Sequence, residues 1–223
     1  MNHFIYVDIE TIPAGDPIDI STIQPPSNMS KPETIAKWRA EQAPKLVDEL
    51  YRKRALNSME GEIVCIGWAI GDEEVRTCTA HADYLNEFDL IDSWSNWLQE
   101  DIDIYDSVIW IGHNALNFDM PWLWRRAVKY DLPWLKSQIR LDRYKNNIHD
   151  TMKIWAGADF KDYTSLDKLA SWLGLGSQNG SGSEVYDNYL KGDYEAIAEH
   201  CKSDVELVRA VYKKIMGGGL FNV

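Results

Sequence analysis

Two acidic side chains, Asp8 and Glu10, stand at the end of the first apolar run of the chain, in the segment YVDIET. The alternation of this run predicts a β-strand, and side chains two residues apart on a strand point to the same face. Two carboxylates on one face resist burial unless both are solvated, one is protonated, or a cation lies between them. An acidic pair at a strand end is usually a solvated boundary, so this segment alone leaves the three alternatives open.

A second acidic group, Asp119, follows the predicted buried strand 107–114 in the segment GHNALNFDMPWL. It opens a predicted helix, and Pro121 lies in the first turn of that helix. Both features are typical of a helix start, so the local pattern favours a capping role for Asp119.

A third candidate group lies on the last predicted helix, in the segment EHCKSDVEL. His200 and Asp204 are four residues apart and therefore share one helix face. A His-Asp pair with this spacing is more often found on the surface. Here Ile197, Val208 and Val211 lie on the same face, which favours a position that points inward.

The elements that must position these groups are strands first and then alternating helices and strands. This order predicts an α/β fold with a mixed central sheet flanked by helices, and such sheets bind ligands beyond their strand ends. After the first strand we expect a strand hairpin over 62–71 and 74–80, helices over 84–100 and 120–131, a strand or extended segment over 148–155, and helices over 164–174 and 193–216.

Composition narrows the class of protein. A chain of 223 residues, of which 45% are hydrophobic, fits one sizeable domain or at most two small ones. It has no apolar run of about 18 residues and no signal-peptide pattern, so we expect a cytoplasmic protein of a bacterium or of a viral host. Cys65, Cys78 and Cys201 are predicted to be reduced core thiols.

The formal net charge of −12 argues against a protein that wraps long duplexes through many phosphate contacts. It is compatible with a site that holds a chain end through divalent cations, because the cations supply the positive charge locally.

Two segments are nevertheless rich in basic residues. After an irregular loop over 13–30, residues 31–60 carry seven Lys or Arg and five acids on two predicted helices. A solvated hairpin is the favoured interpretation, and a substrate-gripping insertion is the alternative. Residues 125–145 carry seven Lys or Arg and two acids, which fits either a track for single-stranded nucleic acid or an ordinary solvated helix and loop.

Taken together and in this order, DIET, NFD and HCKSD resemble the three exonuclease motifs of the DEDD superfamily of 3′–5′ exonucleases, which has a ribonuclease H-like fold. The resemblance covers nearly the whole chain. It is closest to the predicted stand-alone exonucleases related to the proofreading domain of family B DNA polymerases. Their third motif usually reads YC..DV, whereas this chain reads HCKSDV, with His200 where Tyr is usual.

The resemblance implies a centre of two divalent cations, Mg²⁺ or Mn²⁺, which prefer oxygen ligands. Asp8 would bridge both cations, Glu10 and Asp204 would complete the first, and Asp119 would hold the second. His200 would take the water-orienting role.

The resemblance also implies the substrate and its contacts. Thr11, Ile12, Asn114 and Phe118 match positions that touch the terminal nucleotide, although Ile12 and Phe118 also fit simple core roles. We therefore expect residues 1–223 to form one 3′–5′ exonuclease domain with a helical insertion at about 13–60. It would release nucleoside monophosphates from single-stranded 3′ ends, with DNA favoured. RNA trimming and an inactive nucleic-acid-binding module of the same fold are the alternatives.

Overall fold

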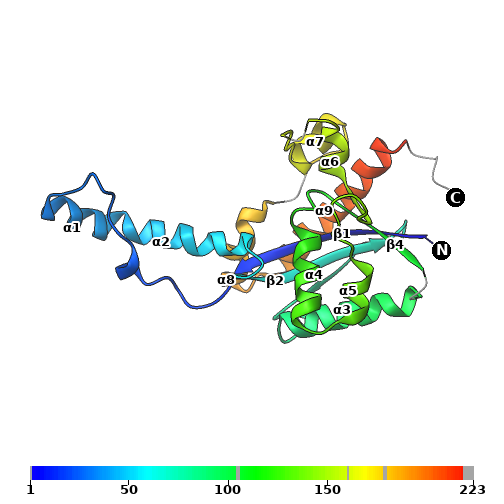
Figure 1. Cartoon of the computed structure of the whole chain (residues 1–223), viewed down its shortest axis with the longest axis horizontal. Helices are drawn as coiled ribbons and strands as arrows, with labels where there is room; N and C mark the ends of the chain where they lie inside the picture. The colour runs from blue at the N-terminus through cyan, green and yellow to red at the C-terminus, as the bar shows by residue number, and fades with distance from the viewer. Residues whose placement is uncertain (1, 104–105, 160, 178–179, 218–223) are drawn as a thin grey trace. The chain divides into compact units, whose positions relative to one another are not determined.

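The computed structural model describes residues 2–103, 106–159, 161–177 and 180–217, which form an α/β fold around one mixed sheet (Figure 1). The chain divides into two compact units. The first, unit 1, comprises Met1–Glu10 and Ile63–Val223, and the second, unit 2, is Thr11–Glu62. The predicted fold class is confirmed.

The sheet has five strands in the order β3-β2-β1-β4-β5. β1 pairs with β4 in parallel, β4 pairs with β5 in parallel, and β2 pairs with β3 in antiparallel. The predicted hairpin of β2 and β3 is present, and its turn begins at Gly71, whose φ of 55° suits glycine. The strands are β1 (Asn2–Pro13), β2 (Gly61–Ile70), β3 (Arg76–Thr79), β4 (Ser107–Gly112) and β5 (Ile148–Asp150).

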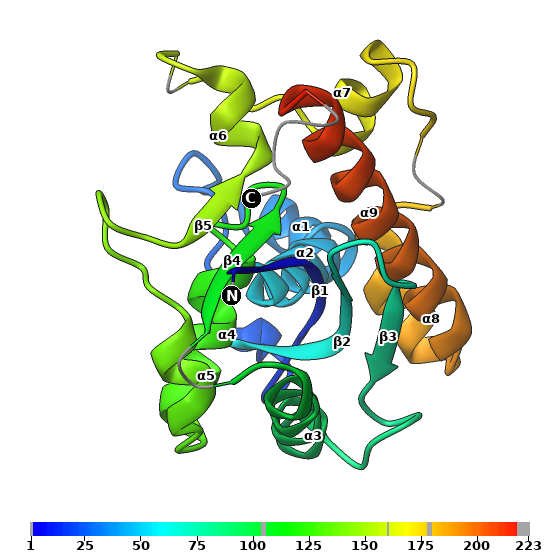
Figure 2. The same cartoon turned by 90° about the vertical axis from the view of Figure 1, so that its right-hand side faces the viewer.

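Helices cover both faces of the sheet in unit 1 (Figure 2). One core cluster joins the sheet to α3 (Glu87–Asp101), α4 (Asp119–Lys129) and α5 (Pro133–Gln138). The other joins it to α7 (Leu166–Trp172) and α9 (Tyr194–Ile215). Shorter helical segments are α6 (Thr151–Ala156), η3 (Gly182–Glu184) and α8 (Val185–Lys191).

The alternation of β1 decides which face receives its acids. Ile5, Val7 and Ile9 belong to the α3 side, whereas Tyr6 belongs to the α9 side. Side chains two residues apart share a face, so Asp8 and Glu10 follow Tyr6 toward α9.

Helix α9 lies close against β2 because β2 has no side chain at Gly67. A Cβ atom built there would lie 2.9 Å from Cys201 Sγ and 3.1 Å from the Cys201 carbonyl oxygen. Only a bare backbone therefore allows the segment of α9 that carries His200 and Asp204 to approach the sheet this closely.

The segment 148–155 differs from its predicted strand. β5 lasts only three residues, and α6 begins directly after it. Asp150 causes the change, because its Oδ1 accepts hydrogen bonds from the backbone N–H groups of Met152 and Lys153 and so caps the helix. The short helices α5 and α8 were not predicted either.

Unit 2 contains two short helices, α1 (Pro32–Glu41) and α2 (Ala43–Arg52), with 3₁₀ turns η1 (Ile20–Thr22) and η2 (Lys53–Leu56). Pro44 lies in the first turn of α2 rather than between the helices, where its missing N–H costs nothing. At the ends of the unit, Ala14 N donates to Glu60 O at 3.0 Å. Across the described ranges, no helix combines the length and apolar character needed to span a membrane.

Candidate active site

The acidic residues of the first motif lie on β1, as the alternation predicts. Glu10 is 7% exposed, and Asp8 is half-buried. Their carboxylates are thus largely removed from water, which makes the solvated-boundary interpretation wrong for Glu10. Such a placement requires compensation from protons or cations.

Asp119 joins these two acids from the start of α4, and its predicted role as a helix cap is wrong. Phe118 occupies the N-cap position and makes no side-chain capping bond. Instead, Asp119 Oδ1 accepts a hydrogen bond from the backbone N–H of Ile9 at 3.1 Å, and the residue is 3% exposed. Because Ile9 lies between Asp8 and Glu10, this bond places the third carboxylate beside the first two.

The turn that precedes Asp119 is held by the buried carboxylate of Asp150, a residue to which the sequence analysis assigned no role. Asp150 Oδ1 accepts from Asn114 N, and Asp150 Oδ2 accepts from Leu116 N, both at 3.0 Å. The chain reverses there with Asn114 at a φ of 60°, two residues after Gly112, where a Cβ would lie 2.6 Å from that of Ala115. Asp150 therefore fixes the path of the backbone between β4 and α4.

His200 and Asp204 complete the group from α9, and both are buried, at 7% and 8% exposure. His200 Nε2 lies 3.4 Å from Glu10 Oε1, and His200 Nδ1 lies 4.0 Å from Asp204 Oδ1. The imidazole thus stands between acids of two different elements. The inward orientation predicted from the apolar neighbours on α9 is confirmed.

Cys201 is a member of the site that the sequence analysis assigned only to the core. Its thiol donates to Asp8, with Sγ 3.5 Å from both the Asp8 carbonyl oxygen and Oδ2. All three cysteines are free and buried, as predicted. The signal was present in the sequence, since Cys201 precedes Asp204 by three residues and therefore shares its side of the helix.

Burial and mutual repulsion dominate the electrostatics of the site. Burial raises the pKa of Asp8 and of Glu10 well above the usual carboxyl range, and the neighbouring carboxylates raise it further. Burial also raises the pKa of Asp119 to about 7, although backbone hydrogen bonds, including the one from Ile9, act against it. A cation among these groups would relieve the repulsion that raises these pKa values.

The donor set fits hard divalent cations. Among the described residues, Glu10, His200 and Asp204 can each offer a ligand atom within 4.8 Å of the other two, and Asp8, Glu10 and Cys201 can do the same. Carboxylate oxygens, which dominate this set, are the preferred ligands of Mg²⁺ and Mn²⁺.

The four predicted substrate residues lie in different surroundings. Thr11 and Ile12 belong to unit 2, where the Thr11 hydroxyl donates to the Ala55 carbonyl at 2.6 Å and Ile12 is buried. Asn114 is half-buried at the turn before α4, and Phe118 packs against Trp122 with ring centroids 5.7 Å apart. The structure thus brings Asn114 and Phe118 to the element that carries Asp119.

A comparison with known families identifies the family of the chain. Residues 63–217 match the model of a family described as predicted 3′–5′ exonucleases related to the exonuclease domain of PolB. The chain belongs to this family. The matched range contains Asp119, His200 and Asp204, whereas Asp8 and Glu10 precede it. The resemblance inferred from the three motifs is confirmed, and this PolB-related exonuclease family implies a nucleic-acid substrate and the use of divalent metal.

A solved structure supports the fold. The chain is similar to the family B DNA polymerase from the hyperthermophilic archaeon Pyrobaculum calidifontis, with a TM-score of 0.59 and 14% sequence identity over 96% of this chain. It spans 24% of that polymerase chain. A comparison with curated proteins gives no match.

Proposed function

We propose that this member of the PolB-related exonuclease family is an active 3′–5′ exonuclease that removes nucleoside monophosphates from single-stranded DNA. The observation that carries the proposal is the bond from Ile9 N to Asp119 Oδ1 at 3.1 Å. It brings a carboxylate from α4 to the backbone amide between the two acidic residues of β1, and Asp204 of α9 lies close to one of these, Glu10. Four acids from three elements gathered at one place are costly for folding, so a function of the acids is the best account of their presence.

We assign the role of metal ligand to Asp8, Glu10, Asp119 and Asp204, for two Mg²⁺ or Mn²⁺ ions. Such ions, when bound, stabilise negative charge on the attacking and leaving oxygens and help water to lose a proton. The chain's own contribution is to hold the four carboxylates together. It does so through the Ile9 amide for Asp119, through the Cys201 thiol for Asp8, and through the buried face of α9 for Asp204.

His200 is the residue to which we assign the orientation of the attacking water. Its Nε2 lies 3.4 Å from Glu10 Oε1 and its Nδ1 lies 4.0 Å from Asp204 Oδ1, so it is close to two of the four proposed metal ligands. An imidazole ring stands here in place of the phenol of the Tyr that is usual at this position.

Substrate binding is assigned to Thr11, Ile12, Asn114 and Phe118, which flank the first and second acidic motifs. We further propose that the whole chain acts as one exonuclease domain, in which residues at about 13–60 form a helical insertion. Seven Lys or Arg in 31–60 and seven in 125–145 supply positive charge for a nucleic-acid backbone on a chain whose net charge is −12.

Digestion of end-labelled substrates tests the proposal. Single-stranded DNA and RNA of the same sequence, labelled at the 5′ end, would be incubated with Mg²⁺, Mn²⁺ or EDTA and with the wild type or Asp8→Asn. We expect a ladder that shortens from the 3′ end, requires the metal, disappears in the variant and is stronger with DNA.

Two results would contradict parts of the proposal. Faster digestion of RNA would make the protein an exoribonuclease. No digestion of either strand by folded, metal-supplied wild type, together with retained binding of the strand, would make it a nucleic-acid-binding module.

A further inference from the structure

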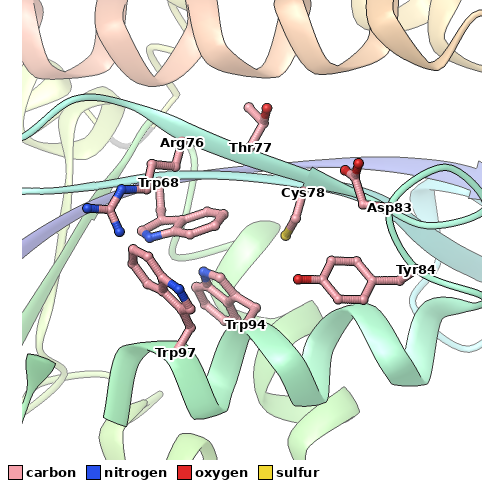
Figure 3. Close-up of a pocket in the computed structure, with 8 residues that line it drawn as sticks. All are labelled: Trp68, Arg76, Thr77, Cys78, Asp83, Tyr84, Trp94 and Trp97. Atoms are coloured by element: carbon pink, nitrogen blue, oxygen red, sulfur yellow. The ribbon is translucent and has the colours of Figure 1, made fainter. Parts of the chain in front are cut away.

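A cavity of about 230 Å³ lies between the β2–β3 hairpin and α3 (Figure 3). Trp68, Trp94 and Cys78 of its lining belong to the same core cluster as Val7 and Ile9 of β1. Asp8 and Glu10 point to the other face of the sheet, so this cavity is separate from the acidic site. It is lined by Trp68, Arg76, Thr77, Cys78, Asp83, Tyr84, Trp94 and Trp97.

Aromatic rings and one cation form its walls. The ring of Trp68 makes T-shaped contacts with Trp97 at 5.5 Å and with Trp94 at 6.3 Å between centroids. The guanidinium of Arg76 lies 3.9 Å from the centroid of Trp97, and the Arg76 side chain is 41% exposed. Flat aromatic surfaces beside a partly exposed cation suit a planar ligand that carries negative charge.

One buried donor in this wall has no hydrogen-bond partner within the part of the chain that the structure describes. Trp94 is 1% exposed, and its Nε1–H finds no acceptor among the residues that the structure describes. In Figure 3 the indole nitrogen lies on the edge of the ring that faces the strands, not the helix backbone. The neighbouring Trp110, in contrast, donates its Nε1–H to Gln138 O at 2.9 Å. A buried donor left unpaired is unfavourable, and a bound acceptor would remove that cost.

The rim of the cavity supplies further charged and hydrogen-bonding groups. Arg76 forms an exposed ion pair with Glu73, with 3.6 Å between the guanidinium nitrogen and Glu73 Oε2, so the positive charge of Arg76 is only partly compensated. The exposed carboxylate of Asp83 lies on the opposite side, where it accepts from Thr79 N at 2.8 Å, and the Tyr84 hydroxyl bonds to Ser93. A ligand would thus meet a buried N–H donor, a cation and a carboxylate acceptor around apolar walls.

We propose that this cavity binds one nucleobase of a nucleotide, with a ring acceptor on Trp94 Nε1–H and the phosphate near Arg76. Nucleobases are planar, carry both donors and acceptors, and stack on aromatic side chains. The volume is below the roughly 300–1,000 Å³ of pockets for larger ligands, which suits a single base. The choice of a nucleobase rests partly on the proposed function, whereas the donor, the walls and the cation do not.

NMR titration of the Trp indole N–H signals tests this proposal without turnover. The full chain, labelled with ¹⁵N at its tryptophans and kept in EDTA, would be titrated with AMP, CMP, GMP and dTMP, and separately with a short single-stranded oligonucleotide. The Trp94 signal would be assigned by its loss in Trp94→Phe. We expect this signal to shift saturably with at least one mononucleotide, while the signal of the exposed Trp172 stays in place. A shift with the oligonucleotide alone would assign the base to a strand rather than to a free mononucleotide.

Variants test whether the nucleotide binds in this cavity or elsewhere on the chain. Trp94→Phe should weaken the affinity about tenfold, as expected for one lost hydrogen bond, and Trp110→Phe should leave it unchanged. Arg76→Gln should weaken the binding of AMP severalfold but not that of adenosine, because only AMP carries a phosphate. Equal affinity of Trp94→Phe and wild type would overturn the proposal.

The proposal and the proposed function fail in different ways. Asp8→Asn should abolish 3′-end digestion and keep the nucleotide-induced shift of the Trp94 signal. Each mononucleotide would be added up to about 10 mM, a concentration that reveals even millimolar affinity. If the Trp94 signal moves with no mononucleotide and not with the oligonucleotide, the face of Trp68 satisfies the indole N–H. That result would remove the nucleobase site and leave the exonuclease proposal intact.

Discussion

At the scale of single residues, the acids of β1 and of α4 differ in what holds them. The Asp119 carboxylate accepts a hydrogen bond from a backbone amide, whereas among the described residues the Asp8 carboxylate accepts only from the Cys201 thiol and lies near other carboxylates. Removing the charge of Asp8 or Glu10 therefore relieves repulsion without breaking a bond to the backbone.

Asp8→Asn and Glu10→Gln should lower the rate of 3′-end digestion at least about a hundredfold, because each removes a group that acts on the reacting charge. Thermal unfolding of both variants in EDTA should occur at the wild-type temperature or above it. Glu100→Gln, at an exposed position, is the control and should keep full activity. Full digestion by a folded Asp8→Asn would refute the assignment of Asp8 as a metal ligand.

The raised pKa values predict how pH acts on the site. Unfolded carboxylates titrate near pH 4, whereas that of Asp119 titrates at about 7 in the folded chain. The folded chain therefore binds more protons between these values, and the contribution of the site to stability falls as pH rises from about 4 to about 7. Divalent cations require the deprotonated carboxylates, so their affinity should rise over the same window.

Thermal unfolding with and without Mn²⁺ measures this linkage. Burial lowers the pKa of His113 and of His149, which gives a contribution of opposite sign, so the useful quantity is the difference between the two conditions. The increase in Tm that Mn²⁺ causes should be larger at about pH 8 than at about pH 5. An increase of the same size at both values would contradict raised pKa values in the metal-free site.

Sequence reasoning at this scale succeeded where the partner of a residue is local. The shared face of Asp8 and Glu10 follows from the alternation of one strand. The capping role of Asp119 was wrong because its partner, Ile9 N, lies 110 residues away. A local pattern contains no information about such a partner.

At the scale of elements, a buried ion pair fastens α3 to α4. Arg126 Nε lies 2.6 Å from Glu87 Oε1, which also accepts from Ile63 N at 2.7 Å, and Tyr130 donates to Glu87 Oε2. Both charged side chains are at most 5% exposed. The helix that carries Asp119 is thus tied to α3 and to β2 through one carboxylate.

Glu87→Ala should lower the free energy of unfolding by about 3 kcal/mol or more, because it removes a buried carboxylate that bonds to Arg126, Ile63 and Tyr130. Denaturant unfolding measures this loss. The double variant Glu87→Ala/Arg126→Leu should recover part of it, since the buried charge is then gone as well. No recovery would mean that the bonds to Ile63 and Tyr130 carry the stabilisation.

Gly67→Ala tests the close approach of α9 to β2. Its Cβ would lie 2.9 Å from Cys201 Sγ, so α9 must shift. We expect a loss of about 1–3 kcal/mol in stability, typical of an overpacked core, and a lower rate of digestion because Asp204 moves with α9. Gly182→Ala meets no atom within 4 Å and is the matched control. Wild-type stability and activity of Gly67→Ala would show that the helix tolerates the shift.

Elements with a strong local pattern were predictable, and those set by a distant contact were not. The hairpin at Gly71 and the long helix α9 follow from turn chemistry and periodicity. The end of β5 at Asp150 did not, because the same carboxylate that starts α6 also holds Asn114 and Leu116. Which of these hydrogen bonds determines the path of the backbone can be seen only in the three-dimensional structure.

At the scale of the whole molecule, the division into two units suggests that the chain can be shortened. Unit 1 contains both core clusters and all four proposed metal ligands. The ends of unit 2 are joined by the 3.0 Å bond between Ala14 N and Glu60 O, so a short linker can span them.

Replacing residues 15–59 by a short Gly/Ser linker should leave a folded protein with metal-dependent digestion. If the segment grips the strand, KM for single-stranded DNA should rise severalfold while kcat changes little, because uniform binding is lost. A matched variant keeps the segment but carries Gln in place of Lys45 and Arg39. It tests whether the positive charge of the segment, rather than its presence, lowers KM. An unfolded shortened chain would show that the segment is integral to the domain rather than an insertion. The fold class and the order of the acidic motifs were predictable from the sequence, whereas the insertion at about 13–60 stays a prediction that the shortened chain tests.

The parallel pairing of β1 with β4 ends at Tyr6 and Ile111, although β1 itself continues to Pro13. Past that point β4 turns away, and the Asp119 carboxylate takes the Ile9 amide that a longer neighbouring strand would have bound. The Asp119 carboxylate therefore both accepts a backbone N–H of β1 at the end of the sheet and forms part of the proposed active site. A loss of activity in an Asp119 variant combines a chemical and an architectural defect, whereas Asp8 offers a clean separation of the two. Inactive versions of this protein intended to trap a bound strand are best made at Asp8.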